Sequence, residues 1–336
     1  MKEDGKSLEK MTRYKSFIIG CGKIAGLYDD LDDDSIYSHA KAYINNNKVD
    51  IVGCWDLNIK NSKTLAEKYN LDVYECNHVN ALEKTKPDIV SICTPDNTHF
   101  EITMSILESD FNPQIIFLEK PACGNENELK ILLNACNKKG VKVVINHSRR
   151  FDKLHKALKE KIQENSFGGL VKVDAVYYSG WQHNGIHTVD TLNFLFDDEL
   201  EFETLINSSD SPYENDPNLD FKCRFKGNQA LVYLTTMNER YYQLFEFDLK
   251  FENARIRIED FGNRLSYEKK TVNNMNEKVL VESDLFISDD SRSSAIQSAV
   301  KELVDNLDGS TSLDGYLLKD IAKTMNTIWE GKKWIE

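Results

Sequence analysis

A glycine-rich turn constrains the fold of this chain more strongly than any other feature. The apolar run from Phe17 to Ile19 leads directly into residues 20–26, which read GCGKIAG. In such a segment the first glycine permits a tight turn, the second lets the backbone approach a ligand, and a small residue at position 25 or 26 lets the following helix pack close to the strand. The start of that helix offers unpaired N–H groups to phosphate. The segment therefore predicts a dinucleotide site, with Gly20, Cys21, Gly22, Lys23 and Ile24 at the pyrophosphate.

The first half of the chain alternates short apolar runs with amphipathic segments. The predicted strands are Phe17 to Ile19, Val49 to Trp55, Asp88 to Cys93, Gln114 to Leu118 and Lys142 to Ile145. The predicted helices between them are Ile59 to Tyr69, Glu101 to Glu108 and Glu126 to Lys138. This alternation is typical of βαβ units around a parallel sheet. We therefore expect an α/β fold whose residues 12–145 form a doubly wound Rossmann domain, after a loose polar tail at residues 1–11.

The second half has a different pattern. Its apolar runs are long and strand-like: Leu170 to Tyr178, Phe221 to Phe225, Ala230 to Thr235 and Phe245 to Ile258. They predict a mostly antiparallel sheet in an α+β domain covering residues 146–336, and helical spacing returns at 293–307 and 316–329. The last helix can pack back on the first domain. We interpret residues 207–219 (NSSDSPYENDPNL) as a solvated connection.

Composition excludes several classes of function. The net charge of -13 argues against nucleic acid or an anionic membrane surface as the main partner. The sequence contains no apolar run long enough for a membrane span and no signal-peptide core at its start. Its seven cysteines form no CxxC pair, which favours reduced thiols and a cytoplasmic protein.

An acidic residue follows the second predicted strand. Asp56 occupies the place where the dinucleotide fingerprint requires a carboxylate for the adenosine ribose, about ten residues later than usual. The extra length corresponds to the acidic insertion at residues 29–35, which we interpret as a solvated loop, with a lid as the alternative. Because a carboxylate repels a 2′-phosphate, Asp56 favours NAD over NADP.

Four further motifs stand at the ends of predicted elements. They are Thr94-Pro95-Asp96-Asn97-Thr98-His99, Glu119-Lys120-Pro121, Asn146-His147-Ser148-Arg149-Arg150-Phe151 and Gly185-Ile186-His187-Thr188-Val189-Asp190. Together with the glycine-rich turn and in this order, they resemble the Gfo/Idh/MocA family of oxidoreductases, from about Tyr14 to the C-terminus. The resemblance implies a second domain with a large open sheet that covers the active site and forms a homodimer or homotetramer interface.

The resemblance also implies roles for individual residues. It places Thr94, Pro95, Asn97 and His99 along the nicotinamide, although His99 could instead cap a helix. It places Lys120 and His187 at the reaction centre, and Asn146, Arg149 and Arg150 at the substrate. Glu119 is interpreted as a structural partner or a neighbour of the cofactor.

Oxidation of a secondary alcohol requires a base for the hydroxyl proton and a cation for the developing charge on oxygen. His187 has a suitable pKa for the base, and Lys120 at the carboxyl end of a parallel strand can donate to the substrate oxygen. Asp190 could orient His187, contact the substrate or serve as a structural acid of the helix.

One position departs from the family pattern. The family commonly carries an aspartate four residues before the histidine, where this chain has His183. If the helix extended that far back, His183, His187 and Asp190 would share one face. His183 could then act as proton relay or substrate contact, or mark altered chemistry. A zinc site formed by these three residues is the weaker alternative, and we expect no metal.

The sequence thus predicts an NAD-dependent dehydrogenase that acts on a secondary alcohol of a sugar, nucleotide sugar or cyclitol. The acidic insertion and the HNGIH segment resemble family members of surface-polysaccharide pathways, which favours a nucleotide sugar. Two alternatives stay open: a non-redox reaction that reduces and reoxidises NAD in each turnover, and a non-catalytic sensor or regulator that keeps the dinucleotide site.

Overall fold

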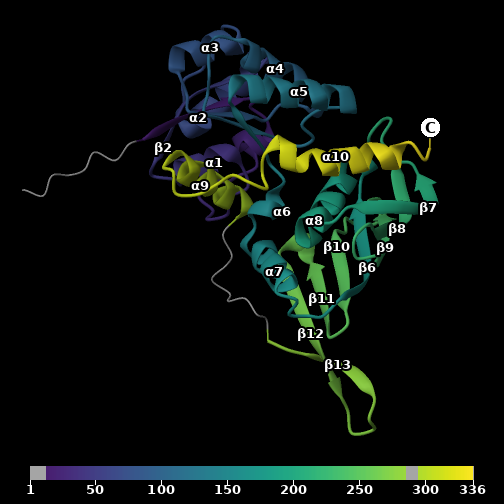
Figure 1. Ribbon diagram of the computed structural model, residues 1–336. Coiled ribbons are helices and arrows are strands. Elements are labelled where there is room, and N and C mark those ends of the chain that lie inside the picture. Colours follow the sequence, from purple (N-terminus) through teal and green to yellow (C-terminus); the bar gives the residue numbers. More distant parts are fainter. Residues whose placement is uncertain (1–12, 285–293, 336) are drawn as a thin grey trace, which may run out of the picture.

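The computed structural model describes residues 13–284 and 294–335, and the predicted tail at residues 1–11 lies outside them. The chain forms two β-sheets, each with its own helices, and the long C-terminal helix lies across the junction between them (Figure 1). The predicted α/β class, with a parallel sheet followed by a mostly antiparallel one, is confirmed.

The first sheet is parallel throughout, with strand order β2-β1-β3-β4-β5. Its strands are β1 (Tyr14–Ile19), β2 (Val49–Trp55), β3 (Ile89–Ile92), β4 (Ile115–Leu118) and β5 (Lys142–Ile145). Strands β3 and β4 are buried along their whole length because helices cover both faces of the sheet. Connections from β1 and β3 run in opposite directions, so the sheet has its topological switch point where the glycine-rich turn ends β1.

The helices of this domain divide between the two faces of the sheet. On one face lie α1 (His39–Ile44), α2 (Ile59–Tyr69) and, from the far end of the chain, α9 (Ala295–Leu307). On the other lie α3 (His78–Thr85), α4 (His99–Glu108), α5 (Glu126–Lys139) and the first half of α10 (Leu318–Lys332). Helix α5 shows how local sequence sets these bounds. Asn125 caps its start by accepting from two backbone N–H groups, and Gly140 ends it at φ +73°.

The first crossover helix is interrupted. The sequence predicted one helix opening at the glycine-rich turn, whereas the structure has a single π-helical turn, η1 (Lys23–Leu27), then the acidic insertion, and then α1. Gly26 explains the close packing of η1, since a Cβ there would lie 2.4 Å from Leu65 Cδ1 of α2. Asp29 is buried and accepts from the Tyr37 backbone N–H at 2.7 Å and from the Ser38 hydroxyl. The rest of the acidic run is exposed, except for half-buried Ser35, as predicted for a solvated loop.

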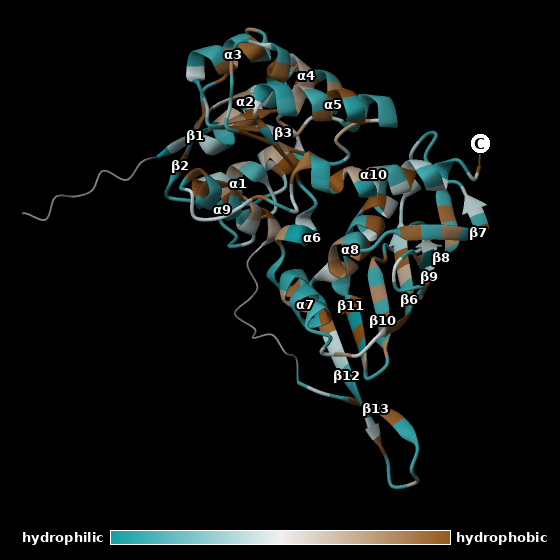
Figure 2. Ribbon diagram, in the orientation of Figure 1, coloured by the Kyte–Doolittle hydropathy of each residue, from teal (hydrophilic) through white to brown (hydrophobic). Residues whose placement is uncertain are grey.

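The second sheet has eight strands in the order β13-β12-β11-β10-β6-β9-β8-β7, and only β6 and β9 pair in parallel. They are β6 (Leu170–Tyr178), β7 (Leu200–Ser209), β8 (Asn218–Phe225), β9 (Leu231–Met237), β10 (Glu246–Phe251), β11 (Ala254–Glu259), β12 (Arg264–Val272) and β13 (Lys278–Glu282). Figure 2 shows hydrophobic and hydrophilic residues alternating along β10 and β11. This period of two buries one face of the sheet and leaves the other polar.

The segment 245–258, predicted as one long strand-rich run, is a hairpin. It turns at Glu252 and Asn253, and β10 and β11 pair from Phe247 opposite Ile258. The buried face of the sheet packs against α7 (Lys153–Gln163) and α8 (Ile186–Phe196), which follow the single turn α6 (Ser148–Phe151).

The last two helices connect the two domains. Apolar residues of α9 pack with the core of the parallel sheet, and Leu317 forms a bridge to Val144 of β5. The second half of α10 instead packs against α8. There Trp181, fully buried, donates its indole N–H to the carbonyl of Ile328 at 2.8 Å. The packing units are therefore not continuous in sequence, and α10 fixes one domain against the other.

Candidate active site

The glycine-rich turn has the geometry that a bound pyrophosphate requires. Gly20 adopts φ +85°, and a Cβ there would lie 2.7 Å from the backbone carbonyl carbon of Cys93. Gly22 differs, because a Cβ there would meet nothing within 4 Å. The turn is thus closed by the protein beneath Gly20 and open above Gly22, as a cradle for a ligand should be.

Asp56 lies beside this turn at the carboxyl end of β2. Its Oδ2 accepts from the backbone N–H of Cys21 at 2.8 Å, and its Oδ1 accepts from that of Asn58 at 2.8 Å. Cys21 therefore contributes only its backbone here, since its side chain is buried. Lys23 is exposed and Ile24 packs partly on the core. The open backbone at Gly22 fits a dinucleotide, and Asp56 lies beside it at the end of β2.

The residues predicted along the nicotinamide follow β3. Pro95 and Asn97 are exposed, and the Thr98 hydroxyl donates to Thr94 Oγ1 at 2.9 Å. His99 is fully buried, with Nδ1 2.6 Å from the Pro121 carbonyl and Nε2 2.8 Å from that of Thr94. His99 thus connects the loops after β3 and β4 and lies beneath the surface that a ligand could contact.

Glu119 belongs to a polar network inside the domain. Its Oε1 lies 2.9 Å from His39 Nε2 and accepts from Asn146 Nδ2 at 2.6 Å. The other ring nitrogen of His39 contacts Ser91 Oγ at 3.0 Å. Although burial acts to raise the pKa of Glu119, the partners His39 and Asn146 leave it below its usual value. Glu119 and Asn146 therefore hold the ends of β4 and β5 together, next to Lys120.

Lys120 reaches from the end of β4 to the second domain. Its Nζ donates to the backbone carbonyl of His183 at 2.9 Å, within the π-helical turn η3 (Trp181–Gly185) that precedes α8. Burial lowers the pKa of Lys120, and the carboxylates of Asp96, Glu119 and Asp216 act against that shift. The ammonium group is thus held at the junction of the domains.

His187 lies in the first turn of α8, close to Lys120. Burial lowers its pKa well below the ordinary value, and the charges of Lys120 and Arg149 lower it further. Its ring meets that of His147 edge-on, with centroids 6.2 Å apart. The pKa of His147 falls to about 4, mainly through burial. The guanidinium of Arg149 stacks 3.8 Å from the ring centroid of Phe245. Burial and the nearby cations therefore favour the uncharged form of the His187 ring.

Arg150 and Asp190, two of the predicted substrate residues, are buried against each other, which fits the structural alternative left open for Asp190. Their side chains are 4% and 2% exposed and form a bidentate ion pair, with Arg150 Nη2 2.8 Å from Asp190 Oδ1. Thr324 of α10 donates to the same carboxylate at 2.9 Å. These partners satisfy both residues, so the geometry assigns them to the framework of α6, α8 and α10 and gives no support to a contact with substrate.

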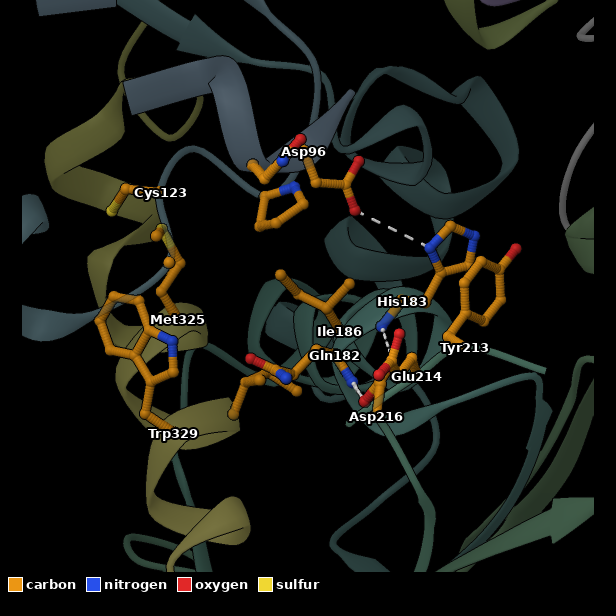
Figure 3. A pocket seen from close by; sticks show the side chains of 14 residues that line it. Asp96, Cys123, Gln182, His183, Ile186, Tyr213, Glu214, Asp216, Met325 and Trp329 are labelled. Carbon is orange, nitrogen blue, oxygen red and sulfur yellow. Dashed lines mark hydrogen bonds and ion pairs between the residues drawn. The ribbon is translucent and has the colours of Figure 1, made fainter. Parts of the chain in front are cut away.

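His183 points into a cavity between the domains (Figure 3). Its ring stacks on that of Tyr213 at 3.8 Å and 25°, and its Nδ1 lies 3.8 Å from Asp96 Oδ2. The backbone N–H groups of Gln182 and His183 both donate to the buried carboxylate of Asp216, at 2.7 and 2.8 Å. The α-helix α8 begins at Ile186 and is preceded by π-helical η3, so it does not extend back to His183.

Sequence reasoning missed the contribution of the loop that joins β7 to β8. We interpreted residues 207–219 as a solvated connection, but Tyr213, Glu214 and Asp216 line the cavity. No local pattern distinguishes these residues from those of an ordinary polar loop. His39 and His147 were missed for the same reason, since their partners are far away in the sequence.

The cavity has a volume of about 350 Å³ and is lined by both domains and by α10. Within residues 13–284 and 294–335, no group of three or more His, Cys, Asp or Glu side chains is arranged to hold a metal ion. Over the same residues, the helices are too short or too polar to cross a membrane.

Comparison with known proteins agrees with this architecture. Residues 15–147 match the model of the Gfo/Idh/MocA oxidoreductase family that describes its NAD-binding Rossmann fold. This match covers the N-terminal domain, which is therefore similar to the NAD-binding domain of that family. It is 28% identical over 154 residues to D-glucoside 3-dehydrogenase of Escherichia coli K12, a match that spans 46% of this chain and 40% of that relative's length.

Solved structures resemble the whole chain in fold. A protein from Desulfitobacterium hafniense, named as a candidate NADPH-dependent oxidoreductase, superposes with a TM-score of 0.78 at 17% identity and 96% coverage of each chain. A super-repressor mutant of Gal80p from Saccharomyces cerevisiae gives 0.75 at 12% identity and 97% coverage of each chain. At such low identity these likenesses show the fold alone.

Proposed function

We propose that this protein is an NAD-dependent dehydrogenase that transfers a hydride between the nicotinamide and a secondary alcohol of a sugar, nucleotide sugar or cyclitol. One observation supports the proposal: Lys120 of the first domain donates to the His183 carbonyl, and its charge acts on the nearby His187 ring of the second domain, beside the edge of the parallel sheet where the glycine-rich turn lies open. Ligands of doubly wound sheets bind at that edge.

The two residues supply complementary chemistry. When bound, NAD supplies the hydride acceptor. His187 accepts the hydroxyl proton at a ring nitrogen as the carbonyl forms, and the lowered pKa favours its uncharged form before the reaction. The Lys120 ammonium donates a hydrogen bond to the substrate oxygen and stabilises its developing negative charge. Because the His183 carbonyl already holds Lys120, the ammonium needs little reorientation.

The carboxylate of Asp56 supports NAD as the cofactor. It lies at the end of β2 and accepts from backbone N–H groups, so a 2′-phosphate at the same place would meet an anion. Competition binding tests this proposal: we expect NAD to bind at least tenfold more tightly than NADP, and Asp56→Ser to reduce that preference. Equal or tighter binding of NADP would contradict it.

The main experiment tests the proposed cofactor, substrate class and catalytic residues together. Mass spectrometry of ligands released from the folded protein should identify the bound dinucleotide, and a panel of sugars, glycosides, polyols and nucleotide sugars should identify which alcohols yield NADH. We expect Lys120→Ala to lower turnover about 100-fold or more while NAD still binds. Lys130→Ala, on the exposed face of α5, is the control. Normal turnover by Lys120→Ala would contradict the assigned chemistry.

A non-catalytic sensor of the same fold is the second candidate. Two observations favour it: the fold resembles that of Gal80p, whose structure is named for a super-repressor mutant, and His183 replaces the aspartate of the family pattern. A sensor would bind NAD without producing NADH from any member of the panel. The presence of both Lys120 and His187 favours the enzyme.

A further inference from the structure

The cavity beside the reaction centre has walls of unequal character. One wall is apolar and consists of Pro121, Ile186, Met325, Ile328 and Trp329. The opposite wall carries the stacked rings of His183 and Tyr213 (Figure 3). At about 350 Å³ the cavity has the size of a site for a small organic group, and apolar and aromatic lining is typical of such sites.

The charges around this cavity are negative. Asp96, Glu214 and Asp216 line it, and no lysine or arginine does so within the described part of the chain. Two lysines act on these carboxylates from outside the lining: Lys120, which is bonded to the His183 carbonyl, and Lys332 near the end of α10. A diphosphate carries two or more negative charges and is usually bound by arginines, lysines or a helix N-terminus. Placed here, it would face three carboxylates.

The turn η3 connects the cavity to the two candidate catalytic residues, although neither Lys120 nor His187 lines the cavity itself. The His183 carbonyl accepts from Lys120 Nζ, while the His183 side chain forms part of the cavity wall. A sugar ring placed at Lys120 and His187 therefore has the cavity next to it. A substituent on that sugar would extend between Trp329 and the His183–Tyr213 stack.

We infer that the cavity binds the uncharged aromatic or apolar aglycone of a glycoside and rejects a nucleoside diphosphate in the same position. This inference rests on the proposed function, since it places the sugar at Lys120 and His187. Of the three substrate classes proposed above, it selects a neutral sugar derivative over a nucleotide sugar.

The test compares matched substrates with the full-length, NAD-loaded protein. Phenyl glucoside and methyl glucoside differ only in the aglycone, and UDP-glucose carries the diphosphate. Burial of a phenyl ring predicts that kcat/KM for phenyl glucoside exceeds that for methyl glucoside about tenfold or more, and that UDP-glucose is the poorest of the three. Equal values for the two glucosides, or a preference for UDP-glucose, would overturn the inference.

Two variants test whether the cavity residues cause the preference for phenyl glucoside over methyl glucoside. Trp329→Ala and Tyr213→Ala, on opposite walls, should each bring the phenyl-to-methyl ratio towards one. Tyr213 is 43% exposed, so its variant leaves the core intact if Trp329→Ala fails to fold. Trp334→Ala, at a tryptophan that packs edge-on against Phe221 and does not line the cavity, should leave the ratio unchanged. A ratio that survives both cavity variants would contradict the proposed site.

Calorimetric binding measurements distinguish a failure of the cavity assignment from a failure of the dehydrogenase proposal. If the protein produces no NADH from any substrate, phenyl glucoside should still bind the NAD-loaded protein more tightly than UDP-glucose, and Tyr213→Ala should weaken that binding. In that outcome the dehydrogenase proposal fails and the cavity assignment stands. Absence of phenyl glucoside binding, with or without turnover of other substrates, would overturn the cavity assignment.

Discussion

The two sides of the candidate active site are built in different ways. The N-terminal side, formed by the glycine-rich turn and Asp56, uses residues that follow single strands, and each is held by backbone groups nearby in the fold. The C-terminal side, formed by η3, the loop before β8 and α10, is assembled from three segments far apart in the sequence. We therefore expect the first side to tolerate changes elsewhere, and the second to depend on long-range contacts.

The largest expected effect concerns the ion pair beneath the C-terminal side. Arg150→Ala leaves the buried carboxylate of Asp190 without its cation, which should lower the free energy of unfolding by about 3–5 kcal/mol. Chemical denaturation measures the change, and exposed Arg240→Ala is the control. A decrease in the free energy of unfolding below about 1 kcal/mol would show that the C-terminal side does not depend on this long-range ion pair.

The next largest effect is expected from acid, at His147, which follows β5 and packs edge-on against His187. Burial holds the pKa of His147 at about 4, against about 6.5 in an unfolded chain, so the unfolded state binds the proton first. The contribution of His147 is therefore complete above about pH 6.5 and is lost as the pH falls to about 4, up to about 3 kcal/mol. Urea titrations across this range should show the decline, and His147→Phe should flatten it. An unchanged slope in the variant would contradict the assignment.

On the N-terminal side, we expect substitution of Gly20 to affect stability and substitution of Gly22 to affect NAD binding. Gly22→Ala should fold normally, because its Cβ meets no protein atom, but should weaken NAD binding by about 1–3 kcal/mol through overpacking against the ligand. Gly20→Ala should instead lower thermal stability, since φ +85° and contact with Cys93 penalise a side chain. Melting temperatures and NAD titrations of the pair measure both effects. Identical behaviour of the two variants would refute the distinction.

The smallest expected effect concerns Asp216. In Asp216→Asn, one amide oxygen can still accept from η3, but the amide nitrogen faces the second backbone N–H, so stability should fall by about 1–2 kcal/mol. Phenyl glucoside binding should weaken while NAD binding stays the same. Exposed Asp210→Asn is the matched control. A loss of NAD binding in Asp216→Asn alone would show that the two sides are coupled.

Features that depend on local sequence were predicted more completely than features that depend on long-range contacts. The parallel sheet could be predicted because its buried strands and glycine-rich turn are local patterns, set by backbone sterics and by burial on both faces. The positions of Asp56, Lys120 and His187 followed from motifs at the ends of those elements. The interruption of the first helix was missed, because the insertion at residues 29–35 gave no sign that Asp29 is buried.

The sequence by itself determined the two sheets and the glycine-rich turn that ends β1, and it suggested Lys120 and His187 as candidates for the reaction. Only the tertiary structure decided what those residues face. It paired Arg150 with Asp190 inside the protein, turned His183 onto Tyr213, and brought the loop before β8 to the cavity. The physical reason is distance along the chain: backbone turns and periodic burial are encoded within a few residues, whereas an ion pair or a ring stack depends on where the whole chain places its partner.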